Sequence, residues 1–376
     1  MKNYIVYLFF IAVAVSANAQ ALLDEAATVE TRKLYSNMIG LSKTGFMLGH
    51  HEDMAYGTSW NAIEGRSDIK DVCGSYPAVH GWDVGRESGA LNIDNVSFAK
   101  MHQWIKGVYD RGGINTISWH VDNPVTGGGA WDTLSAVNQI LPGGKYHEVF
   151  VKKLDYVATF LKACKSGDTY IPIIFRPFHE HNGNWFWWGK GHCTEQEFVE
   201  LWKFTVGYLK NEKGLHHLIY AFSPDRSRMI LNKAKASYLY AYPGDDYVDV
   251  LGLDDYMDVG ISSNGKSMEM QQLDFIQVLQ TITSLANDKK KLSAVTETGL
   301  EGVTNAKWFT SVILNPVKKT PDIHISYIML WRNANTKHHY ATYPGHTSEN
   351  DFKEFYADKM TLFEVDLNDI YHADVH

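Results

Sequence analysis

The sequence predicts a single-domain α/β protein, a (β/α)8 TIM barrel, on two observations. Short apolar runs recur along all 376 residues, and amphipathic helical patterns lie between several of them. No Pro/Ser/Gly-rich linker and no internal repeat divides the sequence, so one domain is expected. An open doubly wound sheet is the alternative, but no glycine-rich dinucleotide fingerprint follows the first run. The eight runs typical of buried parallel strands are 46–50, 78–82, 114–119, 170–175, 218–222, 248–253, 292–295 and 325–331.

Two helices can be placed between these runs. The first is predicted by an apolar stripe at four- and three-residue spacing over residues 150–161. The second is expected to begin at Thr194, because Glu197 follows three residues later and completes a capping box. Strands that alternate with helices in this way favour the barrel, in which the chemistry lies just after the strand ends.

Residues 1–19 have the three parts of a secretory signal peptide. Lys2 precedes a largely apolar stretch over residues 4–15, and Ala17-Asn18-Ala19 precedes Gln20. An ordinary hydrophobic helix is the alternative. Cleavage would leave Gln20 rather than cysteine at the new terminus, and no later run approaches the roughly 20 apolar residues of a membrane-spanning helix, so we expect no membrane anchor. The sequence therefore predicts export, to the periplasm or the medium, with residues 20–376 as the barrel domain.

Charge and composition restrict the partners of the protein. The formal net charge is −8, whereas nucleic-acid binding needs a clustered basic surface, so we expect no nucleic-acid partner. Aromatic residues make up 13% of the chain, with 11 Trp and 21 Tyr, which fits contact with carbohydrate. Three cysteines permit one internal disulfide at most. We expect a monomer.

Polar side chains gather after the predicted strands, and the densest group follows the fourth one. Residues 176–189 read Arg-Pro-Phe-His-Glu-His-Asn-Gly-Asn-Trp-Phe-Trp-Trp-Gly, so Glu180 lies among two histidines and the three tryptophans Trp185, Trp187 and Trp188. The carboxyl ends of barrel strands are where ligands bind. Aromatic faces beside a carboxyl favour a sugar site, because the C–H face of a pyranose packs on an indole ring.

Two glutamates after opposite strands form a candidate catalytic pair. Hydrolysis of a glycosidic bond with retention needs two carboxyls about 5–5.5 Å apart, one as acid/base and one as nucleophile. Glu180 follows the fourth strand, and its apolar surroundings are expected to raise its pKa toward that of a protonated acid. Glu297 follows the seventh strand and is expected to project from a rigid strand tip, as a nucleophile requires. Each glutamate alone is more often a surface carboxylate, and only the pair favours catalysis.

Other side chains at the strand ends have both a functional and an ordinary interpretation. Tyr256 follows the sixth strand and could donate a hydrogen bond to Glu297, or it could be a core aromatic residue. Trp331 and Arg332 follow the eighth strand, where the indole could form the floor of a sugar subsite. The glycine run at residues 127–129 lacks a following Lys-Ser or Lys-Thr, so a flexible loop is expected there rather than a phosphate site. A metal site is the rival hypothesis, with candidate ligands His50, His51, His120, His179 and His181.

These motifs resemble those of glycoside hydrolase family 26, the endo-β-1,4-mannanase family. The resemblance rests on residues 176–183, on Trp185-Phe186-Trp187-Trp188 and on Thr296-Glu297-Thr298-Gly299. It implies a retaining β-mannanase with a (β/α)8 barrel, no catalytic metal and no cofactor, acting on mannan, glucomannan or galactomannan. By the same likeness Glu180 would be the acid/base and Glu297 the nucleophile, and the residues lining the sugar subsites would be His179, Trp185, Tyr256 and Trp331, together with Arg332 and His120.

Alternatives to a mannanase remain open at this point. The family also contains β-1,3-1,4-glucanases and xylanases, which would use the same carboxyl pair on another β-glycan. A noncatalytic sugar-binding barrel is an alternative from a different functional class, although the presence of both glutamates argues against it.

Overall fold

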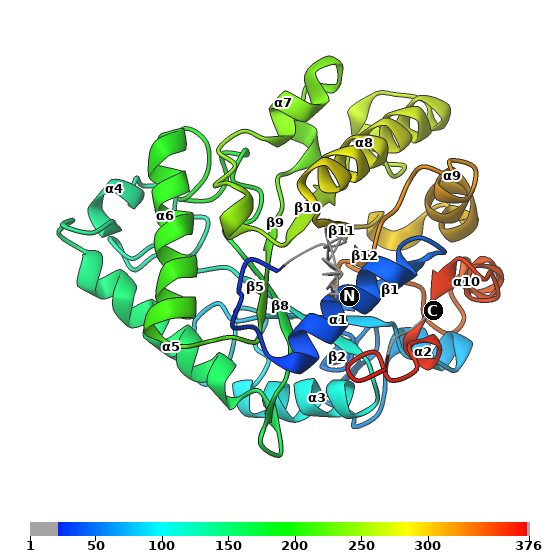
Figure 1. The fold of residues 1–376 in the computed structure, drawn as a ribbon. Helices are drawn as coiled ribbons and strands as arrows, with labels where there is room; N and C mark the ends of the chain where they lie inside the picture. The colour runs from blue at the N-terminus through cyan, green and yellow to red at the C-terminus, as the bar shows by residue number, and fades with distance from the viewer. Residues whose placement is uncertain (1–21, 374–376) are drawn as a thin grey trace, which may run out of the picture.

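The structure contains the predicted barrel, with eight parallel strands surrounded by helices (Figure 1). A computed structural model describes residues 22–373, and the predicted signal peptide at residues 1–19 lies outside them. The eight strands are β1 Phe46–His51, β4 Val79–Asp83, β5 Ile114–Trp119, β8 Ile173–Pro177, β9 Leu218–Phe222, β10 Val250–Asp255, β11 Leu292–Thr298 and β12 Tyr327–Leu330. Each strand pairs with the next in this order, and β12 closes the sheet on β1. The closed parallel sheet confirms the predicted fold class.

The fourth strand begins later than the sequence pattern predicted. Tyr170 belongs to a two-residue strand, β7 (Thr169–Tyr170), which pairs antiparallel with β6 (Lys165–Ser166) outside the barrel. Pro172 separates this hairpin from β8, because proline has no N–H to donate to a sheet ladder. The strand instead continues to Pro177, so Arg176 lies within the barrel wall and is buried.

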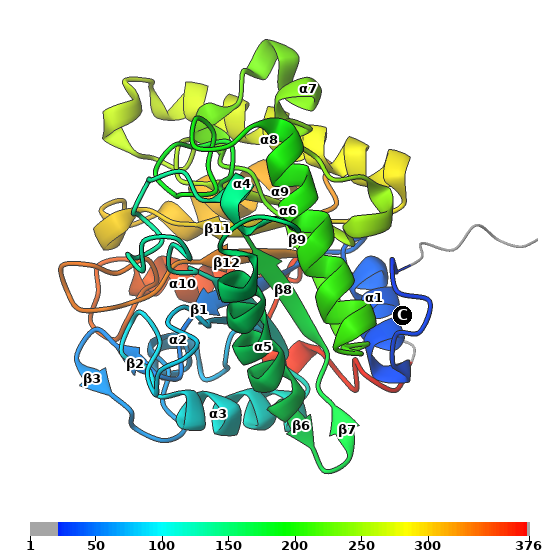
Figure 2. The same ribbon diagram turned by 90° about the vertical axis from the view of Figure 1, so that its left-hand side faces the viewer.

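Both predicted helices are present. α5 buries its apolar stripe against the barrel, and α6 has Thr194 as its N-cap with the capping box complete. Both helices cover the face of the barrel that is nearest the viewer in Figure 2. The α-helices are α1 Val29–Leu41, α2 Asp68–Cys73, α3 Phe98–Asp110, α4 Val137–Ile140, α5 His147–Ala163, α6 Glu195–Gly207, α7 Ala234–Tyr238, α8 Met268–Lys289, α9 Asn315–Lys318 and α10 Glu349–Tyr356.

Shorter elements complete the fold. A small hairpin, β2 (Tyr56–Gly57) with β3 (Trp60–Asn61), follows β1, and β13 (Thr361–Leu362) pairs parallel with the first two residues of β1. Two π-helical segments, Tyr208–Glu212 and Phe309–Leu314, follow α6 and precede α9. The 3-10 segments are Arg226–Arg228, Leu231–Lys233, Asp245–Tyr247, Ser262–Asn264, Glu301–Val303 and Glu364–Asp366.

The N-terminal segment covers the end of the barrel at which the strands begin. The Leu23 amide donates to Asp249 Oδ1 (2.8 Å), and the Tyr35 hydroxyl of α1 donates to the Asp249 carbonyl (3.0 Å). The Thr28 amide donates to the His216 carbonyl. Since Asp249 precedes β10 and His216 precedes β9, α1 lies across the amino ends of these strands (Figure 1). Ligand access is therefore expected at the opposite end, where the strands finish.

The core rather than covalent cross-links holds the barrel together. Cys73, Cys164 and Cys193 are all free thiols, so the single disulfide that the sequence permitted does not form. Within residues 22–373, no helix combines the length and the apolar character needed to cross a lipid bilayer.

A buried ion network links β1, β4 and the C-terminal segment. The His80 ring lies between Asp53 Oδ1 (2.7 Å from Nδ1) and Glu364 Oε2 (3.2 Å from Nε2), and Arg111 donates to both oxygens of Glu364. His80 is fully buried. Burial by itself lowers the pKa of His80, but the two carboxylates outweigh burial and raise the pKa to about 9.

The stability of the protein is therefore expected to depend on the charge of His80. Because the folded-state pKa lies above the unfolded value of about 6.5, this contribution is complete below about pH 6.5 and is lost as the pH rises through about 9. We expect the free energy of unfolding to fall by roughly 3 kcal/mol over this window, and His80→Gln to remove that dependence. Urea unfolding at a series of pH values tests this, with His372→Gln, an exposed histidine, as the matched control. Equal pH slopes in the parent protein and His80→Gln would contradict it.

Candidate active site

A cleft of about 600 Å³ opens at the carboxyl ends of the barrel strands. Side chains at or just after the ends of β5, β8, β10, β11 and β12 form its walls. Seven of the eight residues predicted for the site line it. The lining residues are His120, Trp131, His179, Glu180, Trp185, Phe186, Tyr256, Gly260, Ile261, Ser262, Glu297, Gly299, Leu300, Glu301, Thr304, Trp331 and Tyr340.

The turn after β8 presents Glu180 to the cleft from a strained backbone. Phe178 (φ 49°) and Glu180 (φ 54°) both adopt left-handed conformations that side-chain-bearing residues rarely take. The Glu180 amide donates to the Ser223 carbonyl (2.7 Å), which ties the turn to the end of β9. Trp185 Nε1 donates to Glu180 Oε2 (2.6 Å) and fixes the carboxyl in the cleft. Strain of this kind persists where the surroundings hold it, and it concentrates at functional sites.

The electrostatic environment of Glu180 favours its protonated form. Burial is the largest effect that raises the pKa of Glu180 well above its usual range. The negative charges of Glu297, Asp254 and Asp225 raise it further, whereas the Trp185 hydrogen bond lowers it. Glu180 can therefore carry a proton under conditions in which an ordinary carboxyl has lost it.

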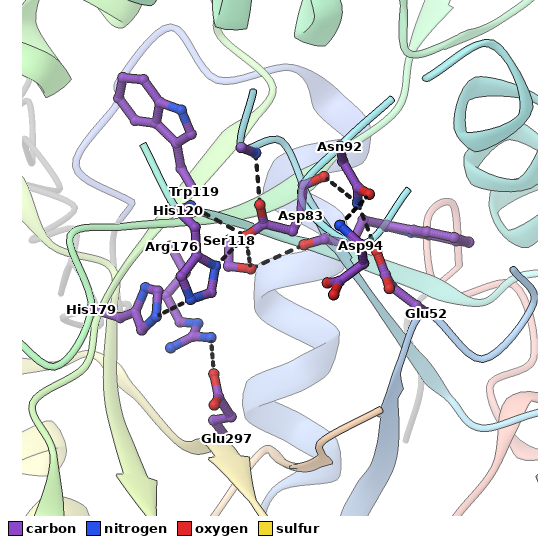
Figure 3. Close-up of polar contacts among 12 residues, drawn as sticks. Glu52, Asp83, Asn92, Asp94, Ser118, Trp119, His120, Arg176, His179 and Glu297 are labelled. Carbon is purple, nitrogen blue, oxygen red and sulfur yellow. Dashed lines mark hydrogen bonds and ion pairs between the residues drawn. The ribbon is translucent and has the colours of Figure 1, made fainter. Parts of the chain in front are cut away.

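Glu297 has a hydrogen-bond donor at each of its two carboxyl oxygens. The Tyr256 hydroxyl donates to Oε1 (2.8 Å), which confirms the contact predicted from the sequence. The Arg176 guanidinium donates to Oε2 (2.5 Å) from within β8 (Figure 3). It also pairs with Asp254 Oδ2 (2.6 Å). Both contacts stabilise a carboxylate and hold it in a fixed orientation.

Irregular pairing at the ends of β10 and β11 helps to aim Glu297. Along β10, Leu253 pairs with Val295, but the next residue, Asp254, pairs with Glu297. Thr296 is thus an extra residue on β11, and the pairing between β11 and β12 is also irregular here. A bulge re-aims the side chains next to it and is common beside active sites. Glu297 lies within the strand, as expected for a rigidly held group.

Aromatic and imidazole rings line the cleft around the two glutamates. Trp331 stacks on His51 (ring centroids 4.4 Å apart, interplanar angle 10°), which leaves its indole on the cleft wall. His120 Nε2 lies 3.2 Å from His179 Nε2 (Figure 3). Trp185 lies beneath the guanidinium of Arg228, whose Cζ is 5.0 Å from the ring centroid.

Arg332 does not line this cleft. Its guanidinium pairs with Asp94 Oδ1 (2.9 Å) and contacts the Tyr56 hydroxyl. It lines a neighbouring hollow of about 520 Å³ beside the β2–β3 hairpin. The structure thus places Arg332 in a hollow outside the cleft wall, and its role in sugar binding stays a prediction.

Two of the three tryptophans after β8 are structural rather than part of the site. Trp187 and Trp188 are fully buried, and their indole N–H groups donate to the carbonyls of Val121 (2.8 Å) and His179 (2.9 Å). Only Trp185 faces the cleft. The predicted rise in the pKa of Glu180 through burial is confirmed, and neighbouring carboxylates add to it. Of the three tryptophans, Trp185 donates the hydrogen bond to Glu180.

The five histidines proposed as metal ligands do not gather around one point, although His120 and His179 face each other. His181 stacks on Phe198 and faces the Tyr240 carbonyl (2.8 Å from Nε2), away from His179. His51 packs on Trp331. Over residues 22–373, no three His, Cys, Asp or Glu side chains come together in a group that could hold a metal ion.

Three residues that shape the site have no role predicted from the sequence. Arg176 holds Glu297 and is itself paired with Asp254, and the signal for both was a charged residue in an otherwise apolar strand. Trp131 follows the glycine run that was interpreted as a flexible loop. Its indole is 56% exposed, lines the cleft and stacks on His120 (5.2 Å, 18°), which is the arrangement that a sugar platform requires.

Comparison with known proteins places the chain in a family. The model described as glycosyl hydrolase family 26 matches residues 23–343. A mannan endo-1,4-beta-mannosidase from Bifidobacterium adolescentis is 34% identical over 363 residues, which cover 91% of this chain and 35% of that protein. One from Bacillus subtilis is 31% identical over 211 residues, covering 52% of this chain and 55% of that protein. The chain thus spans about a third to half of the length of these relatives.

Solved structures agree with this placement. A GH26 β-mannanase from Bacteroides ovatus is 38% identical with a TM-score of 0.85, covering 93% of this chain and 99% of that one. A modular endo-β-1,4-mannanase from Cellulomonas fimi is 35% identical with a TM-score of 0.85, covering 94% of this chain and 80% of that one. With the (β/α)8 barrel and the match over most of its length, the chain belongs to glycosyl hydrolase family 26.

Proposed function

We propose that this chain is a retaining endo-β-1,4-mannanase that hydrolyses mannan, glucomannan or galactomannan, with Glu180 as acid/base and Glu297 as nucleophile. The observation that carries the proposal is the contrast between two glutamates at one cleft. Glu180 lies near other carboxylates and favours its protonated form, whereas Arg176 and Tyr256 donate hydrogen bonds to the two oxygens of Glu297. Retaining glycosidases require one carboxyl that acts as acid/base and a second that acts as nucleophile. The relatives named as mannanases supply the substrate class.

The reaction follows from these positions in two steps. Glu180 donates its proton to the glycosidic oxygen while Glu297 attacks the anomeric carbon, so that the C–O bond breaks and a covalent glycosyl-enzyme forms. Glu180, now a carboxylate, takes a proton from water, and the water oxygen attacks the same carbon. Glu297 leaves as a carboxylate, and the sugar keeps its β configuration.

Product analysis on linear and galactose-branched mannans tests the proposed substrate and mode of attack. We expect a fast loss of polymer viscosity with slow release of reducing ends, because attack within the chain shortens polymers early. The first product detected by NMR should be the β anomer. A mixed-linkage β-glucan and a xylan serve as comparison substrates, since one relative at 22% identity is named an endoglucanase. Faster hydrolysis of either comparison polymer, or an α anomer as first product, would overturn the proposal.

Replacement of Tyr256 by phenylalanine tests how Glu297 is held. The variant lacks the donor to Glu297 Oε1, and a hydrogen bond to a charged group contributes about 1.5–3 kcal/mol. We therefore expect kcat/KM on mannan oligosaccharides to fall about 10- to 100-fold. Tyr356→Phe, at the end of α10, is the matched control. A Tyr256→Phe enzyme within about twofold of the parent would show that Arg176 suffices.

We also infer that the chain is exported as a monomer. Residues 1–19 have the pattern of a signal peptide, which supports export. N-terminal sequencing of the protein from the periplasm or the medium should begin at Gln20, and light scattering should give the mass of one chain. Retention of residues 1–19, or recovery only from the cytoplasm, would contradict export, and a dimer mass would contradict the monomer.

A further inference from the structure

Asp83 is a fully buried carboxylate at the end of β4 that the proposed reaction does not use. Its Oδ1 accepts from the Gly85 amide (2.6 Å), and its Oδ2 accepts from Ser118 Oγ (2.8 Å) and His120 Nδ1 (2.7 Å). Figure 3 shows the contacts to Ser118 and His120. Burial raises the pKa of Asp83, but the contact with His120 and the other donors outweighs burial and lowers it. Asp83 is therefore an anion that can only accept hydrogen bonds.

This anion determines which nitrogen of His120 carries a proton. A neutral imidazole has one N–H and one bare nitrogen, and the partner of one nitrogen decides the state of the other. Since Asp83 accepts from Nδ1, a neutral His120 has a bare Nε2. With His120 neutral, that nitrogen can only accept, and it lies 3.2 Å from His179 Nε2, so His179 is the donor. Burial, followed by the charge of Arg176, keeps the pKa of His179 well below its usual range, so His179 is neutral.

His179 in turn lies in the strained turn that presents Glu180. Its neighbours on both sides, Phe178 and Glu180, have left-handed backbones. The His179 carbonyl accepts from Trp188 Nε1 (2.9 Å), and its ring packs edge-on against Phe186 (5.1 Å, 67°). The His179 ring has His120 as its hydrogen-bond partner.

We propose that Asp83 is a positioning residue that acts through two histidines. It holds His120 in the Nδ1–H tautomer, and His120 accepts a hydrogen bond from His179, which fixes the turn that carries Glu180. The relay crosses the ends of three adjacent barrel strands, β4, β5 and β8. The effect of the relay on catalysis rests on the proposed role of Glu180. The tautomers of the two histidines do not depend on that role.

The tautomers can be measured in the unaltered protein. In ¹⁵N-histidine-labelled enzyme, long-range ¹H–¹⁵N spectra distinguish a protonated ring nitrogen from a bare one. We expect Nδ1–H with bare Nε2 for His120 and Nε2–H with bare Nδ1 for His179. A proton on His120 Nε2 in the neutral ring would overturn the proposal. This result does not depend on activity, so it stays informative even if the chain fails to hydrolyse mannan.

Asp83→Asn tests the consequence for turnover. The amide can donate to His120 Nδ1 and force the proton to Nε2, so His179 loses its acceptor. We expect kcat on mannan oligosaccharides to fall about 100-fold, the scale of a small misplacement of a reacting group, with KM changed much less. Ser118→Ala removes another donor to the same carboxylate and should keep kcat near the parental value. A folded Asp83→Asn enzyme with parental kcat would overturn the proposal.

A double-mutant cycle separates positioning from general structural damage. If Asp83 acts through His120, then Asp83→Asn should cost little in a protein that already carries His120→Gln. Independent structural damage would instead give additive losses, and additive losses would overturn the proposal. If Asp83→Asn does not fold, the tautomer measurement on the unaltered protein decides alone.

Discussion

Replacing Glu297 by alanine is expected to lower kcat on mannan oligosaccharides on the order of 10⁵-fold, because the variant has no group to form the covalent intermediate. The fold should survive, since Arg176 keeps Asp254 as a partner in the space that Glu297 leaves. Turnover is measured by release of reducing ends, and circular dichroism checks the fold. Glu269→Ala, an exposed glutamate in the first turn of α8, is the matched control and should match the parent.

Rescue by azide sharpens this test. A small anion can enter the space left by Glu297 and attack the anomeric carbon of an activated aryl mannoside from the same side. The product should therefore be a glycosyl azide of α configuration, and its appearance should depend on azide concentration. Near-parental mannan hydrolysis by Glu297→Ala, or a β-configured azide product, would contradict the assignment of the nucleophile.

Replacing Glu180 by alanine is expected to lower kcat about 10²- to 10⁴-fold on mannan, but far less on aryl mannosides with good leaving groups. Such a leaving group departs without a proton, so the first step no longer needs Glu180. The second step still lacks its base, so the glycosyl-enzyme should accumulate and give a burst of the released phenol. In the parent enzyme, activity should fall at alkaline pH as Glu180 loses its proton. Because the pKa of Glu180 is raised, this alkaline limb of the pH–activity profile should lie above the pH range in which an ordinary carboxyl titrates.

A control variant and a comparison of two substrates test the acid role of Glu180. Glu195→Ala, an exposed glutamate at the start of α6, should leave both substrates unaffected. Equal losses on mannan and on the activated aryl mannoside would contradict an acid role for Glu180, because a residue that only binds sugar would affect both alike. An alkaline limb that persists in the Glu180→Ala enzyme would contradict it as well.

The barrel could be predicted from the sequence because its strands are buried on both faces. A strand of this kind must be apolar along its length, so each of the eight strands could be recognised from its own residues, without knowledge of the strands beside it. The error at β8 has a local cause: the apolar pattern continues through residues 170–172, but Pro172 cannot join the ladder. An apolar pattern indicates which residues are buried. Buried residues can lie outside the part of the strand that is hydrogen-bonded to its neighbours.

The positions of Glu180, Glu297 and Tyr256 could also be predicted, because parallel strands of a barrel end on the same side. Residues more than a hundred positions apart are therefore brought to one cleft by topology alone. The sequence could not distinguish Trp185 from Trp187 and Trp188, because all three follow the same strand. Which indole faces the cleft depends on the turn after β8 and on the carbonyls that the other two contact.

The amino-acid sequence by itself determined the barrel, the pair of glutamates and the family, because these depend on hydrophobic periodicity and on residue types at strand ends. Only the tertiary structure decided the partners of each group: Arg176 and Tyr256 on Glu297, carboxylates around Glu180, and Arg332 outside the cleft. Hydrogen bonds and charge interactions act over a few ångströms between residues far apart in the chain. Strand register, a bulge and strained turns set those distances, and none of these follows from composition or spacing.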